Sequence, residues 1–86
     1  MPYIKAEDRV KFEAALNFIK KYPPETAGEL NYLVTMILQA YKEHHGVKYA
    51  TFNDMLGALE GSKLELYRRD IAPYEDKKVK ENGDCY

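Results

Sequence analysis

Four prolines, at positions 2, 23, 24 and 73, are the main interruptions in this 86-residue chain. Between them the apolar residues recur every three or four positions, which is the spacing of an amphipathic helix. Proline ends or kinks a helix because it lacks the backbone N–H and its ring crowds the preceding turn. The run VKYA at 47–50 is too short to found a sheet. The chain is therefore predicted to be all-α.

The first helix is predicted over Ala6–Lys21, ending before the adjacent prolines. Glu7 and Lys11 make a favourable i,i+4 pair outside its apolar stripe. The residues of the stripe are Phe12, Ala15, Leu16 and Ile19.

The second helix carries the clearest start signal in the sequence. Thr26 can accept a hydrogen bond from the Glu29 amide while Glu29 reaches back to the Thr26 amide, forming a capping box. The helix is predicted to run to about His44, with Gly46 as its stop. Its apolar face comprises Leu30, Leu33, Val34, Ile37 and Tyr41.

An extended connector is predicted over 47–50. Thr51 then repeats the start signal, with Asp54 at the third helical position, where a carboxylate suits the helix dipole. The third helix is predicted from Phe52 to about Ala72.

Pro73 predicts a break or kink, because inside a helix it would clash with the Arg69 carbonyl and remove one hydrogen bond. Proline is also favoured as the first residue of a helix, so PYEDKKVKEN is predicted to form a short final helix stopped by Gly83. The expected fold is a small bundle of three main helices plus this short C-terminal helix, in one domain over 1–86.

Charge and composition exclude several classes of protein. Thirteen basic residues oppose fourteen acidic ones, giving a net charge of −1, so general nucleic-acid binding is not expected. One cysteine, Cys85, rules out an internal disulfide and a Cys-based metal cluster. The charged N-terminus is not a signal peptide, and no apolar run is long enough to span a membrane. We expect a soluble cytoplasmic protein without a cofactor.

The order of residues resembles a family of short uncharacterised prokaryotic helical proteins. The shared segments are a PYIK start at 2–5, GELNYL at 28–33, YRR-x-x-x-PYE at 67–75 and an NGD-x-Y ending at 82–86. The resemblance spans nearly the whole chain. It implies a helical domain and brings no established activity with it.

Within the third helix, four polar residues lie on or beside the apolar face defined by Phe52, Leu56, Leu59 and Leu66. They are Glu60, Lys63, Tyr67 and Asp70, called here the polar line. Burying an unpaired charge is very costly, so these groups must reach water, one another, another chain or a ligand. Lys63 could pair with Glu60 at the surface while its stem covers the core. The functional alternative is a cleft or subunit interface.

Arg68 and Arg69 point about 100° apart on a helix, so they cannot grip one phosphate from the same face. Arg69 follows Glu65 by four residues, which favours a helical ion pair. The alternative is that Arg68 or Arg69 joins an anion or carboxylate clamp in a dimer.

Two further features favour an interaction surface. Gly57 and Gly61 would let another backbone approach the helix closely, within the fold or across a dimer, which would offset their low helix propensity. Eight tyrosines and no tryptophan suit half-buried positions and interfaces.

His44 and His45 lie near a helix C-terminus, where the dipole explains them, and no metal-ligand spacing is present. Phosphate-binding and hydrolase motifs are absent, as are completed carboxylate pairs of the nucleotide-pyrophosphohydrolase type. The function predicted from sequence is a non-enzymatic interaction module that forms a homodimer. The alternative is an enzyme or binding protein for a small phosphorylated or nucleotide-like anion, using Glu60, Lys63 and Arg68 or Arg69.

Overall fold

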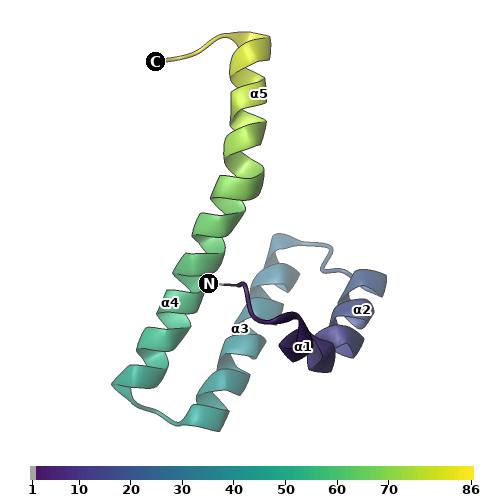
Figure 1. Ribbon diagram of the computed structural model, residues 1–86, viewed down its shortest axis with the longest axis vertical. Helices are drawn as coiled ribbons and strands as arrows, with labels where there is room; N and C mark the ends of the chain where they lie inside the picture. Colours follow the sequence, from purple (N-terminus) through teal and green to yellow (C-terminus); the bar gives the residue numbers. More distant parts are fainter. Residues whose placement is uncertain (1) are drawn as a thin grey trace. The chain divides into compact units, whose positions relative to one another are not determined.

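A computed structural model describes residues 2–86, and all its regular elements are helical in this range. Three helical stretches follow one another along the chain (Figure 1). The all-α prediction is thus confirmed. By their contacts the described residues form two units, Tyr3–Met55 and Leu56–Tyr86 with Pro2, and each is described separately.

The first stretch contains α1 (Ala6–Arg9), the 3₁₀ turn η1 (Val10–Phe12) and α2 (Glu13–Lys21). These bounds match the predicted first helix, which the sequence had not shown to contain a 3₁₀ turn. Arg9 holds the start of this helical stretch, because its Nε and Nη2 donate hydrogen bonds to the Ile4 carbonyl at 3.1 and 2.9 Å.

The second stretch is α3 (Ala27–His45), and its cap is half of the predicted capping box. The Glu29 amide donates to Thr26 Oγ1 at 3.1 Å, as expected. The Glu29 carboxylate, however, accepts from the Glu25 amide at 3.0 Å, one residue before the predicted partner. Gly46 ends the helix with a φ of 92°, a left-handed conformation that favours glycine.

The start of the third stretch corrects the sequence prediction. Helix α4 (Tyr49–Leu66) begins before Thr51, and the Phe52 amide already donates to the Lys48 carbonyl at 3.2 Å. Thr51 is therefore inside the helix, where it is 1% exposed and not an N-cap. Asp54 lies beyond the first turn, and the expected connector is shorter because Tyr49 is already helical.

The end of the third stretch also differs from expectation. The helix does not stop at Pro73: α4 leads into a π-helical turn, η2 (Tyr67–Ile71), and then directly into α5 (Ala72–Asn82) (Figure 1). The predicted separate C-terminal helix is thus wrong. A π turn can absorb the proline because its wider backbone does not need the hydrogen bond that proline cannot donate. Gly83, with a φ of 88°, ends the helix as predicted.

The apolar side chains of the Tyr3–Met55 unit are only partly covered. Its half-buried aliphatic residues are Ile19, Leu33, Val34, Leu38 and Met55. Ile37, expected on the inner face of α3, is 64% exposed. Among the described residues of the chain, no large apolar side chain is fully buried.

A Thr26→Ala substitution should lower the free energy of unfolding by about 1 kcal/mol, because it removes the acceptor for the Glu29 amide. The measurement is a shift in the denaturant midpoint. An unchanged midpoint would show that Thr26 does not cap α3.

A Thr51→Val substitution should raise the free energy of unfolding by about 1 kcal/mol. The Thr51 hydroxyl is buried without a hydrogen-bond partner among the described residues, and valine replaces it with a methyl group of similar shape. Were Thr51 an N-cap, the same substitution would destabilise the protein. The sign of the midpoint shift decides between the two.

Candidate functional site

The residues singled out from sequence all lie in the unit Leu56–Tyr86. Glu60 and Lys63 belong to the second half of α4, and Tyr67, Arg68, Arg69 and Asp70 form most of η2. Backbone hydrogen bonding along one helix places them, so their relative positions follow from helical geometry alone.

Glu60 and Lys63 make an ion pair at the surface. Lys63 Nζ lies 3.7 Å from Glu60 Oε1, and their side chains are 73% and 58% exposed for Lys63 and Glu60 respectively. Pairs this exposed contribute little to stability. The two charges therefore remain accessible to another molecule.

The π turn changes which residues share a face. The Ala72 amide donates to the Tyr67 carbonyl, five residues back, instead of to a carbonyl four residues back. A single π turn inserts one extra residue into the helix. Residues eight apart across it consequently align, as residues seven apart do in an uninterrupted α-helix.

Tyr67 and Glu75 are eight residues apart across this turn. A side-chain hydrogen bond to Glu75 raises the pKa of Tyr67, as do the charges of Glu75 and Asp76 and partial desolvation. The neutral Tyr67 phenol can donate a hydrogen bond to the Glu75 carboxylate. A negatively charged Tyr67 phenolate would instead be repelled by that carboxylate. The π turn thus joins a residue of the polar line to α5.

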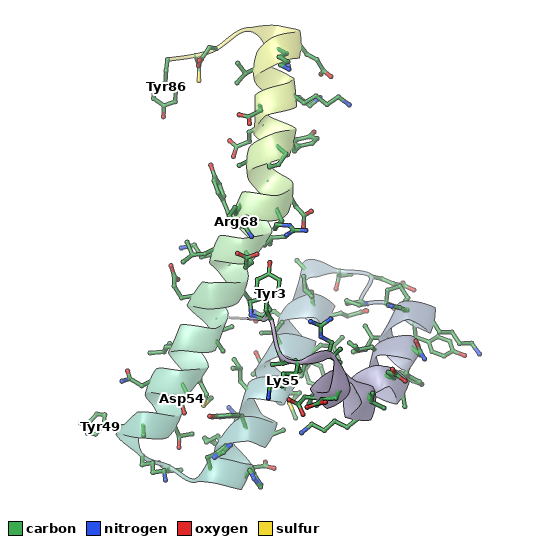
Figure 2. The ribbon with its side chains drawn as sticks, viewed as in Figure 1. Tyr3, Lys5, Tyr49, Asp54, Arg68 and Tyr86 are labelled. Atoms are coloured by element: carbon green, nitrogen blue, oxygen red, sulfur yellow. The ribbon has the colours of Figure 1, made fainter. Side chains whose placement is uncertain are left out.

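Glu65 pairs with Arg68 rather than with Arg69, the partner expected from sequence. Arg68, which is labelled in Figure 2, donates from Nε and Nη2 to the two carboxylate oxygens of Glu65 at 3.1 and 3.0 Å. This bidentate geometry is the strong form of a guanidinium–carboxylate contact. Arg68 therefore engages a carboxylate of its own helix, and does not form a ready-made clamp with Arg69.

The glycine prediction concerns close packing along α4. A Cβ built on Gly57 meets nothing within 4 Å among the described residues. Gly61 is already buried within the described chain, so packing of a second copy stays a prediction for Gly57 only.

The polar C-terminal part of the helix borders a hollow of about 250 Å³. Glu75, Lys78, Val79 and Asn82 contribute one wall from α5, and Gly83 and Cys85 follow them in the chain. Lys78 Nζ also pairs with Glu81 Oε2 at 3.3 Å. Sequence reasoning missed this hollow, because the path of the chain after Gly83 was not predictable from the residue pattern.

Sequence reasoning also missed a contact between α3 and the start of α4. The Tyr41 hydroxyl donates to Asp54 Oδ2 at 2.8 Å, and this hydrogen bond is the main cause of a raised pKa at Tyr41. The rings of Tyr41 and His45 lie 4.1 Å apart. The described residues contain no group of three or more potential metal-ligating side chains. This cluster therefore ties two helices together and does not suggest a metal centre.

Substituting Glu75→Gln should lower the pKa of Tyr67 toward its ordinary value, because the amide removes the negative charge that opposes phenolate formation. NMR titration of labelled tyrosines measures the change, with Tyr67→Phe to assign the signal. Glu81→Gln is the matched control and should leave this pKa unchanged. A pKa insensitive to Glu75→Gln would contradict the contact.

Comparisons with known proteins agree with the resemblance seen in the sequence. Residues 1–85 match a family described as "Domain of unknown function (DUF6899)". No curated protein and no solved structure matches the chain. Among the described residues, every helix is too short or too polar to cross a membrane. Because the family match covers almost all of the sequence, the chain belongs to the DUF6899 family.

Proposed function

We propose that this chain is a non-enzymatic interaction module, and that it forms a homodimer through the helix between Leu56 and Asn82. The observation that carries the proposal is the apolar surface of that helix. Within the unit Leu56–Tyr86 the helix is the only described regular element. Its exposed large apolar residues are Leu56, Leu59, Leu64, Leu66, Tyr67, Ile71, Tyr74 and Val79.

Such a helix gains by association. An isolated helix in water is only marginally stable, and most helical stability in proteins comes from packing of the apolar face. Fully burying one large apolar side chain contributes about 1.5–3 kcal/mol. Leu56 alone is 66% exposed, so a partner on this face would gain a substantial part of that energy at each contact.

A second copy of the chain suits this surface better than a highly charged partner. The net charge is −1, so two copies repel one another only weakly. The charged groups considered for an anion site already have partners on the same helix, Lys63 with Glu60 and Arg68 with Glu65. These pairs support an interaction surface over an anion-binding pocket.

Light scattering should report a dimer at micromolar concentration. Leu56→Ser should weaken dimerisation several-fold while leaving helicity by circular dichroism largely intact, because the side chain is mostly exposed within its own chain. Val47→Ser is the matched control: this residue is 78% exposed but lies before α4, so the dimer should persist. A wild-type monomer across the whole concentration range would remove the proposal.

A further inference from the structure

One face of the helix between Leu56 and Asn82 carries a series of side chains that is symmetric about Arg69. Each member has a counterpart at the same distance from Arg69 on the other side. The members, called here the α4–α5 stripe, are Leu56, Leu59, Glu60, Lys63, Tyr67, Ile71, Glu75, Lys78, Val79 and Asn82.

The π turn is what keeps these residues on one face. From Lys63 to Glu75 the stripe advances in three consecutive steps of four, through Tyr67 and Ile71. In an uninterrupted α-helix each such step rotates the side chain by about 40°, so the two halves would drift apart. The extra residue of η2 takes up most of that rotation. Its midpoint, Arg69, is also the midpoint of the stripe.

Two observations agree with this count. The π turn brings Tyr67 and Glu75, eight residues apart, onto one face, and the effect of the Glu75 carboxylate on the Tyr67 phenol is consistent with that placement. The 250 Å³ hollow is bordered by Glu75, Lys78, Val79 and Asn82 together, so the far half of the stripe is also one surface.

The charges of the two halves are complementary. Glu60 is the counterpart of Lys78, and Lys63 is the counterpart of Glu75. Two pairs of apolar members match as well, Leu59 opposite Val79 and Tyr67 opposite Ile71, whereas Leu56 lies opposite Asn82. In a pair of antiparallel helices related by a twofold axis, such counterparts lie beside one another, and each contact occurs twice.

We propose that the second copy docks antiparallel on the α4–α5 stripe, with the twofold axis passing beside Arg69. This inference rests on the homodimer proposed above and specifies its interface. Glu60 and Lys63, already paired within one helix, then meet Lys78 and Glu75 of the second copy. Leu56 of the second copy lies at the Asn82 end of the stripe, where the hollow can receive it.

Other arrangements of the same two helices lose this complementarity. A parallel pair in register places Glu60 and Lys63 each opposite its own copy, so like charges meet and disfavour it. Sliding the antiparallel pair by seven residues separates Glu60 from Lys78 and Lys63 from Glu75, so the opposite charges no longer meet. The charge pattern therefore favours the antiparallel orientation in this register.

The first test mixes two charge variants, Glu60→Lys and Lys78→Glu, distinguished by mass. Each alone should dimerise at least tenfold more weakly than wild type, because like charges then meet across the interface twice. Mixed together, they should form the heterodimer preferentially, since both contacts are again between opposite charges. Native mass spectrometry measures the three populations. Each chain keeps its own helix in both assemblies, so the preference reports the interface and not helix stability.

The matched control replaces Lys78→Glu with Lys77→Glu, a neighbouring lysine that is not in the stripe. Mixed with Glu60→Lys, it should give no preference for the heterodimer beyond the statistical ratio. Equal preference with both partners would overturn the assigned contact, because it would reflect net charge alone.

The second test fixes the orientation in a Cys85→Ser background. Chains with Leu59→Cys and Val79→Cys should form a disulfide with one another when mixed and oxidised, and neither should cross-link with itself. Self-cross-linking of Leu59→Cys would indicate parallel helices and overturn the antiparallel proposal while leaving the homodimer standing. A wild-type monomer would remove the homodimer itself, so the two failures are distinguishable. A dimer in which neither cross-link nor charge preference appears would place the interface elsewhere.

Discussion

Pro73 has no amide hydrogen to donate to the Arg69 carbonyl, and the C-terminal half of the structure depends on how the backbone absorbs that loss. A break would have separated α5 from α4 and left a short C-terminal helix. The π turn η2 instead lets the helix continue from Tyr49 to Asn82. It also rotates α5 relative to a straight helix, which determines the residues that share a face with Glu60 and Lys63.

The apolar side chains left exposed on this helix bear directly on the stability of the chain. A helix gains most of its stability from packing its apolar face, and among the described residues no large apolar side chain is fully buried. Exposed apolar surface on this scale supports the proposed partner, and no helix among the described residues is long and apolar enough to cross a membrane. The physical case for a partner therefore rests on the fold and not on a catalytic motif.

Much of the fold was predictable because it depends on local chemistry. The Thr26 cap requires only the Glu29 amide three residues later, and the stops at Gly46 and Gly83 require only glycine's tolerance of a positive φ. The pair Lys63–Glu60 also follows from helical spacing alone. In each case the interacting groups lie within one turn, where sequence and geometry are directly linked.

What the sequence determined by itself is the helical class, the position of α3 and the polar line on one helix. Only the tertiary structure decided the role of Thr51, which carries a cap signal but is buried within α4. It also decided that Tyr41 of α3 bonds Asp54 of α4, since their separation along the chain is not a helical spacing. The response to Pro73 was likewise open, because a break, a kink and a π turn all relieve the same clash. Where several local backbone conformations have similar energy, packing against residues far away in the sequence decides which one forms. The residue pattern alone does not reveal that packing.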